Sequence, residues 1–130
     1  MDPRLNESIN HYLGKKVSQF DRTVPDELGC ARAVALVLEK AYKIDIRSQG
    51  TDNLDQTLRK NGWVEVPSQE IASGDVIIGR RANRPGHAGI YVGGNEIFNN
   101  DSNAKRMQID SLDKFRNPEF VTVKVYRKVR

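Results

Sequence analysis

The sequence contains a single cysteine, Cys30, among 130 residues. Without a second cysteine an internal disulfide is excluded, so stability must come from a hydrophobic core and the thiol is free for packing or chemistry. Cysteine and histidine are together too few for a cluster typical of zinc, and the acidic residues lack the spacing of a calcium-binding loop. We therefore expect neither a metal nor a cofactor.

Long apolar runs are also missing, since no segment approaches the roughly 18 apolar residues that suggest a membrane-spanning helix. The first residues, MDPRLNESINHYL, lack the cationic start and the uninterrupted apolar segment of a secretory signal. We expect synthesis in the cytoplasm without a signal peptide, and no membrane span. The length of 130 residues predicts a single domain, 1–130.

The charge is moderately basic, with a formal net charge of +4 and a pI near 9.3. Basic residues gather at Arg80, Arg81 and Arg84 and in the tail KVYRKVR, which favours an anionic partner or, more plainly, a solvated basic surface. They are not interleaved with aromatic residues that could stack on bases. We therefore expect no nucleic-acid partner.

Apolar periodicity predicts helices in the first half of the chain and strands in the second. A short amphipathic helix is expected from about Leu5 to Leu13, a buried central helix over Ala31 to Leu38, and a third helix from Asn53 to Lys60. The strands are expected in WVEV, GDVIIG, HAGIYVG, EIFN and EFVTVKVYRKV. Helices followed by strands indicate an α+β domain with an antiparallel sheet packed on the buried helix.

Cys30 stands at the start of the apolar helix, directly after Gly29. The free N–H groups and the dipole of a first helical turn favour negative charge, so this position is expected to lower the pKa of the thiol. Gly29 removes side-chain bulk beside the sulfur, and the backbone N–H of Cys30 is available to an oxyanion. Cys30 is a candidate nucleophile, although a lone cysteine beside alanine and valine is also typical of a small buried residue.

His87 opens the apolar strand GHAGIYVG and is one of two histidines in the sequence. Strand alternation places His87, Gly89 and Tyr91 on one face, where Gly89 leaves room beside the imidazole. His87 is therefore a candidate base. The other histidine, His11, lies in the expected surface helix and is interpreted as structural or solvent-facing.

The group that orients the His87 ring depends on the register of the following hairpin. A three-residue loop (93–95) places Asn99 on the face of His87, whereas a two-residue loop brings Asn100 to that position. Asp101 shares the alternation of Asn99 and is a third alternative.

Three segments carry a family resemblance: LGCARAVALVLEKAY, GWVEVPSQEIASGDVIIG and GHAGIYVGGNEIFNN. From roughly Gly29 to Asn99 they resemble the NlpC/P60 and CHAP group of papain-like cysteine hydrolases. In that group a helix-borne cysteine, a histidine that opens a strand and a polar residue one hairpin later form a triad. The resemblance assigns these roles to Cys30, His87 and Asn99, and implies a papain-like α+β fold with N-terminal helices packed on a C-terminal antiparallel sheet.

Two positions depart from the usual pattern of this group. The nucleophile often lies within Asp-Cys-Ser-Gly, whereas glycine and alanine flank Cys30 here, and the third residue is frequently a histidine where this sequence has Asn99. The group often places an aromatic or glutamine side chain near the oxyanion hole. Tyr12 and Gln19 are candidates, and spacing does not separate them.

The resemblance implies a cysteine hydrolase that cleaves an amide bond of bacterial cell-wall peptidoglycan, within the stem peptide or between sugar and peptide. Such an enzyme would reach the wall by lysis, injection or non-classical export, as a phage lysin, a tail-associated enzyme or an antibacterial effector. A phage particle or an immunity protein would then be its partner. The alternatives are a cysteine peptidase for protein or isopeptide amides, and a non-catalytic module that binds an anionic polymer.

Overall fold

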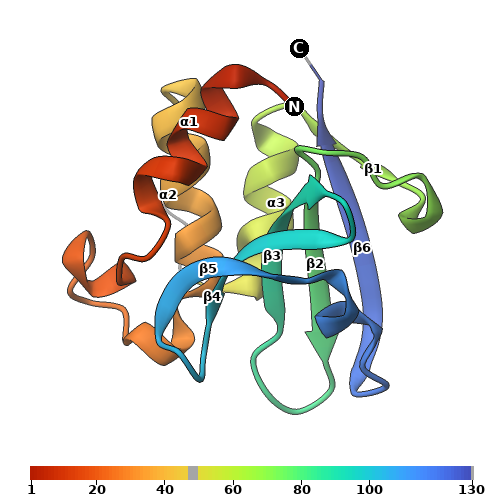
Figure 1. The fold of residues 1–130 in the computed structure, drawn as a ribbon. Helices are drawn as coiled ribbons and strands as arrows, with labels where there is room; N and C mark the ends of the chain where they lie inside the picture. Colours follow the sequence, from red (N-terminus) through yellow and green to blue (C-terminus); the bar gives the residue numbers. More distant parts are fainter. Residues whose placement is uncertain (47–49, 130) are drawn as a thin grey trace.

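The computed structural model describes residues 1–46 and 50–129 (Figure 1). These residues form three α-helices, α1 (Pro3–Tyr12), α2 (Cys30–Tyr42) and α3 (Thr51–Lys60). They also form six strands, β1 (Trp63–Val66), β2 (Val76–Arg81), β3 (His87–Gly93), β4 (Glu96–Asp101), β5 (Arg106–Ser111) and β6 (Phe120–Lys128). Short 3-10 helices are η1 (Val17–Gln19), η2 (Asp26–Leu28), η3 (Ser68–Glu70) and η4 (Leu112–Arg116).

The described strands form one antiparallel sheet in the order β1-β6-β2-β3-β4-β5. The three helices gather on one side of this sheet (Figure 1), with α2 against β3 and β4. Helices that precede the strands in sequence and cover one face of an antiparallel sheet define an α+β domain. The predicted fold class is confirmed.

The central helix α2 is buried, as its alanine- and leucine-rich sequence predicts. Every side chain from Ala33 to Leu38 is buried, so the helix has almost no solvent-facing stripe over this stretch. It continues beyond the predicted end to Tyr42 and stops at Lys43, whose φ of 57° is the left-handed conformation common after a helix. The core therefore holds α2, and with it Cys30, in a fixed position.

Strand β5 has no counterpart among the strands expected from the sequence. Its residues RMQIDS offer two apolar side chains, Met107 and Ile109, which is too weak an alternation to predict a strand. The strand forms because it pairs along its whole length with β4. This pairing brings Gln108 and Asp110 into the surroundings of Asn99.

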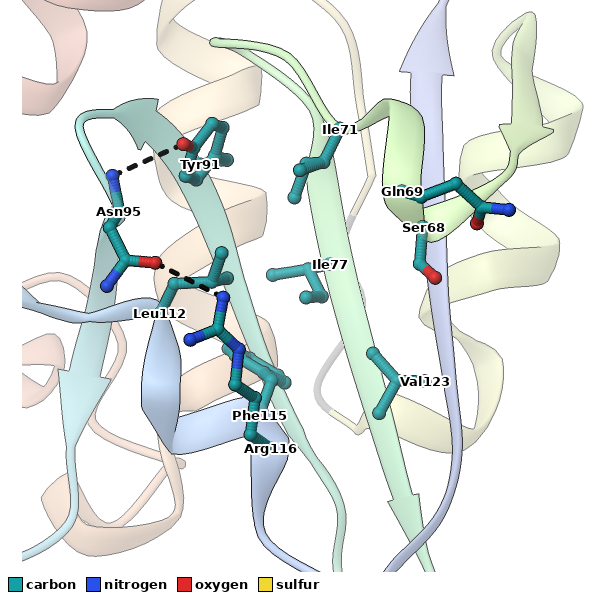
Figure 2. A pocket seen from close by; sticks show the side chains of 10 residues that line it. All are labelled: Ser68, Gln69, Ile71, Ile77, Tyr91, Asn95, Leu112, Phe115, Arg116 and Val123. Atoms are coloured by element: carbon teal, nitrogen blue, oxygen red, sulfur yellow. Dashed lines mark hydrogen bonds between the residues drawn. The ribbon is translucent and has the colours of Figure 1, made fainter.

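The face of the sheet away from the helices carries a second apolar cluster, formed by Ile77, Ile97, Phe115 and Val125. A pocket of about 460 Å³ lies on this face, lined by residues of η3, η4 and the strands between them (Figure 2). Phe115 also contacts the ring of His87, with the two ring centroids 5.4 Å apart. The second cluster therefore supports the histidine.

Candidate active site

Cys30 is the first residue of α2, and its side chain is partly exposed. The thiol donates to the carbonyl oxygen of Gly86, with sulfur and oxygen 3.8 Å apart. Because the first residues of a helix have no intrahelical acceptor for their N–H groups, the backbone N–H of Cys30 points away from the helix and lies beside its own sulfur. One residue therefore offers both a nucleophile and a donor for an oxyanion.

Two glycines allow close packing around Cys30. A Cβ atom at Gly29 would lie 2.9 Å from Cγ2 of Val17, so this glycine makes room for Val17 rather than providing the expected clearance beside the sulfur. A Cβ atom at Gly86 would overlap the carbonyl oxygen of Gly79. Both positions therefore require glycine for packing.

The electrostatics of Cys30 differ from the expectation for a helix N-terminus. Burial of the sulfur raises the pKa of the thiol, and the nearby backbone N–H groups of Ala88, Ala31 and Cys30, which favour the thiolate, offset only part of this effect. Desolvation disfavours the charged form, and here it outweighs the helix N-terminus. The expected lowering of the pKa is wrong for the free protein, whose thiol is protonated at neutral pH.

His87 is the first residue of β3, and its Nε2 atom lies 2.8 Å from Oδ1 of Asn99. Burial lowers the pKa of His87, and the positive charges of Lys114 and Arg81 lower it further. The hydrogen bond with Asn99 and the charge of Asp101 act in the opposite direction without reversing the shift. The imidazole is therefore neutral at pH 7, the form that can accept a proton.

The β3–β4 hairpin decides which residue faces the His87 ring. Its turn comprises two residues, 94–95, both with positive φ, and an irregularity in pairing between Tyr91 and Gly93 adds an extra residue to β3. The short turn and the bulge together give the register that a three-residue loop would give. Asn99 consequently lies on the face of His87.

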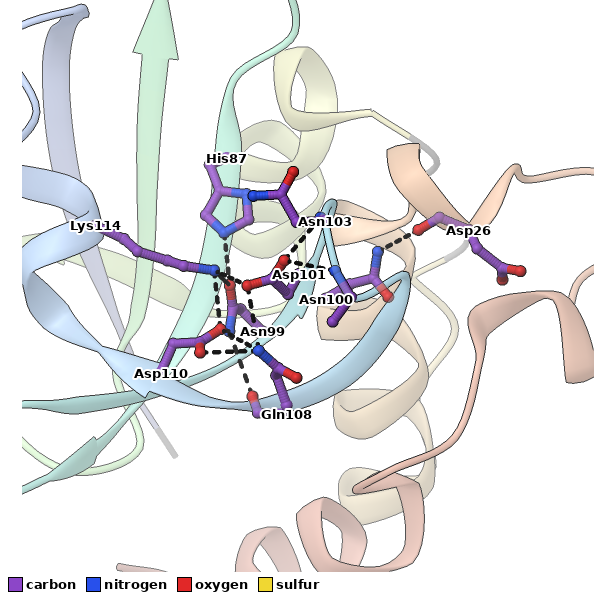
Figure 3. Close-up of polar contacts among 10 residues, drawn as sticks. Asp26, His87, Asn99, Asn100, Asp101, Asn103, Gln108, Asp110 and Lys114 are labelled. Carbon is purple, nitrogen blue, oxygen red and sulfur yellow. Dashed lines mark hydrogen bonds and ion pairs between the residues drawn. The ribbon is translucent and has the colours of Figure 1, made fainter.

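Asn100 and Asp101, the other two alternatives, have different partners (Figure 3). The Asn100 side chain donates from Nδ2 to the backbone oxygen of Asp26 at 2.5 Å. Asp101 accepts from Nζ of Lys114 at 2.8 Å, and this contact, more than any other, holds the pKa of its carboxyl well below the usual range. Of the three alternatives, the structure brings Asn99 to His87.

Lys114, Asp110 and Gln108 complete the polar surroundings of Asn99 (Figure 3). The sequence did not single them out, because β5 and η4 were not predicted. One signal was present: Asp110 and Lys114 are opposite charges four residues apart and form an ion pair at 2.8 Å. That spacing is informative on a helix, and these residues lie at the junction of a strand and a 3-10 helix.

Cys30 lies where two pockets meet, and we call the two together the active-site groove. The larger pocket, about 520 Å³, reaches the start of α3, and the smaller, about 200 Å³, reaches His87. Cys30 and His87 thus line the same pocket. The residues that line both pockets are Leu28, Cys30, Arg81, Arg84, Pro85 and Gly86.

The two oxyanion candidates from the sequence are not among the described residues that line the groove. Tyr12 is buried against the rings of His11 and Phe20. Gln19 accepts from the backbone N–H of Lys16. The backbone N–H of Cys30, a residue that lines the groove, remains the candidate oxyanion donor.

The basic residues of the groove are held by ion pairs. Nε of Arg81 lies 2.8 Å from a carboxylate oxygen of Glu119, and Arg84 pairs with the other oxygen of the same carboxylate. The Arg84 side chain is still 62% exposed. Two cations that share one anion leave the wall of the groove with a positive charge.

Within residues 1–46 and 50–129, no group of three or more His, Cys, Asp or Glu side chains is arranged to hold a metal ion. The described helices also include none whose length and apolar character would suit a membrane crossing.

A cysteine that opens a buried helix and a histidine on an antiparallel sheet, lining one pocket, are the arrangement of the papain-like cysteine hydrolases. The model of the NlpC/P60 family matches residues 14–125, and the chain belongs to this family. Its members are typically cysteine peptidases or amidases. No curated protein matches the chain.

Solved structures of NlpC/P60 domains share the fold. The NlpC/p60 domain of the peptidoglycan hydrolase SagA has a TM-score of 0.65 and 13% identity, with 94% of this chain and 95% of that chain covered. The P60 domain of antigen MAP1204 from M. avium subspecies paratuberculosis has a TM-score of 0.66 and 12% identity, with 98% and 93% covered. NlpC1 from Trichomonas vaginalis has a TM-score of 0.51 and 21% identity, with 77% and 34% covered.

Proposed function

We propose that the protein is a cysteine hydrolase that cleaves amide bonds in bacterial cell-wall peptidoglycan, as an endopeptidase or an amidase. The observation that carries this proposal is that Cys30, at the N-terminus of α2, and His87, hydrogen-bonded to Asn99, line one pocket. A nucleophile, a base and a group that orients the base are the elements of a catalytic triad.

In the first half of the reaction, a neutral thiol and a neutral imidazole act together. The Cys30 sulfur attacks the carbonyl carbon of the amide while the thiol proton moves to Nδ1 of His87, the ring nitrogen that does not face Asn99. The backbone N–H of Cys30 donates to the oxyanion of the tetrahedral intermediate. The C–N bond then breaks as the imidazolium gives its proton to the leaving amine, which leaves a thioester on Cys30.

In the second half, water replaces the amine. The neutral His87 ring removes a proton from the water as its oxygen attacks the thioester carbonyl. Collapse of the second tetrahedral intermediate releases a carboxylic acid, and the proton returns from His87 to the Cys30 sulfur. The enzyme ends in its starting protonation state.

The substrate class is supported by the family and by the charge of the groove. Stem peptides of peptidoglycan carry free carboxylates, and the wall of the groove is positively charged through Arg81 and Arg84. The solved domain of SagA belongs to a protein described as a peptidoglycan hydrolase. Electrostatic attraction of this kind favours an anionic substrate and weakens with salt.

Digestion of purified peptidoglycan, with mass analysis of the released fragments, tests the proposal. We expect fragments from the unmodified protein and none from Cys30→Ala or His87→Ala. The matched control is His11→Ala, the second histidine of the chain, which should digest normally. Fragments from Cys30→Ala would contradict the mechanism, whereas inactivity on peptidoglycan with activity on isopeptide-linked proteins would retain the mechanism and change the substrate.

Because peptidoglycan lies outside the cytoplasmic membrane, we place the action of the enzyme at the cell wall or periplasm. It would arrive there by lysis, injection or non-classical export, with a phage particle or an immunity protein as partner. Expression in the cytoplasm and expression with an added export signal can be compared in one bacterial host. We expect lysis when the protein is exported; lysis on cytoplasmic expression alone would contradict this location.

A further inference from the structure

The contacts around Asn99 point to a device that sets the protonation pattern of His87. We propose that Lys114, together with Asp110, is a positioning residue that fixes the orientation of the Asn99 amide and, through it, the Nε2–H tautomer of His87. The catalytic consequence of this inference rests on the proposed function. The tautomer itself is a property of the folded protein and can be measured without any substrate.

Asn99 is fully buried and each end of its amide has partners of one kind. Nζ of Lys114, which can only donate, lies 3.1 Å from Oδ1 of Asn99. Nδ2 of Asn99 donates to a carboxylate oxygen of Asp110 at 2.8 Å and to the backbone oxygen of Gln108 at 3.3 Å, and both of these atoms can only accept. The amide oxygen therefore faces the cation, and the amide nitrogen faces the acceptors.

The reversed amide would be strongly disfavoured. It would set the NH₂ group against the Lys114 ammonium and the amide oxygen against the Asp110 carboxylate and the Gln108 carbonyl, so that the buried amide oxygen would face acceptors instead of donors. Lys114 and Asp110 are themselves paired at 2.8 Å, so each holds the other in place. The charges on both sides therefore select one orientation of Asn99.

This orientation determines the tautomer of His87. Oδ1 of Asn99 can only accept, so the Nε2 atom that lies 2.8 Å away must carry the hydrogen and donate it. A neutral imidazole has a single N–H, which leaves Nδ1 unprotonated. Nδ1 is then the atom that can take the proton of the Cys30 thiol, and the opposite tautomer could not perform this step.

Nuclear magnetic resonance can read the tautomer directly, because two-bond ¹H–¹⁵N couplings of ¹⁵N-labelled histidine distinguish Nε2–H from Nδ1–H. The chain has two histidines, so a His11→Ala variant assigns the pattern of His87. At a pH where the ring is neutral we expect the Nε2–H pattern for His87. In Lys114→Met we expect a mixture of the two tautomers, and in Lys114→Arg the pattern of the unmodified protein.

Lys60→Met is the matched control, because it removes the charge of an exposed lysine at the end of α3. Its His87 pattern should be unchanged. If Lys114→Met does not fold, Asp110→Asn tests the same device from the acceptor side and should also give mixed tautomers. An Nδ1–H pattern in the unmodified protein, or an unchanged pattern in the folded Lys114→Met or Asp110→Asn variant, would overturn the inference.

Kinetics on peptidoglycan fragments link the device to catalysis. Lys114→Met should lower kcat by about tenfold or more with little change in KM, because the base is impaired while the groove is intact. Lys114→Arg should restore most of the loss. A shifted tautomer with unchanged kcat would refute the catalytic role of Lys114, and an inactive unmodified protein with the expected tautomer would refute the proposed function alone.

Discussion

Gly29 either leaves clearance beside the Cys30 sulfur or makes room for the Val17 side chain, and replacement of Gly29 by alanine distinguishes these two explanations. The new Cβ atom would lie 2.9 Å from Cγ2 and 3.1 Å from Cβ of Val17, a side chain that is fully buried. The φ of Gly29, −88°, is accessible to alanine, so the cost arises from packing and not from the backbone. Overpacking typically costs about 1–3 kcal/mol, and the lower entropy of the unfolded alanine chain offsets roughly 0.4–1 kcal/mol.

We therefore expect Gly29→Ala to lower the free energy of unfolding by about 1–2 kcal/mol, measured by urea denaturation. For a domain of this size the melting temperature should fall by roughly 3–10 °C. Because the clash lies under the first turn of α2, Cys30 should also move by a few tenths of an ångström. Peptidoglycan cleavage should fall together with stability, since catalysis is sensitive to such displacements.

The double variant Gly29→Ala/Val17→Ala provides the decisive comparison. If the clash with Val17 is the cause, the two changes should couple favourably by about 1 kcal/mol or more, since the smaller side chain accommodates the added methyl group. Strictly additive effects would refute the packing argument. A Gly29→Ala protein with unchanged stability and reduced thiol reactivity would also refute it. That result would show instead that Gly29 provides clearance beside the Cys30 sulfur.

Three further results are expected. Because burial raises the pKa of Cys30, alkylation of the folded protein by iodoacetamide should have a midpoint above the ordinary value of about 8.5 and return to it in urea; a lower folded midpoint would contradict the burial argument. Asn99→Ala should reduce kcat on peptidoglycan by about tenfold or more in a protein that calorimetry shows to be folded. Gly86→Ala, which overlaps the carbonyl oxygen of Gly79, should cost about 3 kcal/mol in urea denaturation, and a stable variant would show that the β2–β3 connection can yield.

The predictable parts of the fold are those with a strong local pattern. The alanine-, valine- and leucine-rich run after Cys30 has apolar residues on several sides, so it can only be a buried helix, and β2 and β3 are short apolar runs between turn residues. β5 and η4 lack such a pattern, since β5 forms through pairing with β4. The residues that surround Asn99 lie on these two elements and were missed for that reason.

In the candidate site, too, some features follow from a local sequence pattern and others depend on strand pairing. The sequence contains the residue types of the site in the right order: a cysteine that opens a helix, a histidine that opens a strand, and three consecutive polar residues after a glycine turn. The choice of Asn99 depended on a bulge in β3, which is a compromise between turn geometry and strand pairing. A one-residue change in the β3–β4 register would have placed the side chain of Asn100, instead of Asn99, on the face of His87.

Local sequence patterns predict the order of helices and strands, the central position of α2 and the residues available for chemistry, because these follow from side-chain type and from patterns a few residues long. Three outcomes depend on long-range contacts: which asparagine meets His87, why position 29 is glycine, and the burial that raises the pKa of the Cys30 thiol. These three outcomes depend on atoms that lie far apart in sequence. Packing, register and desolvation are set when such atoms come together, so no local pattern could contain them.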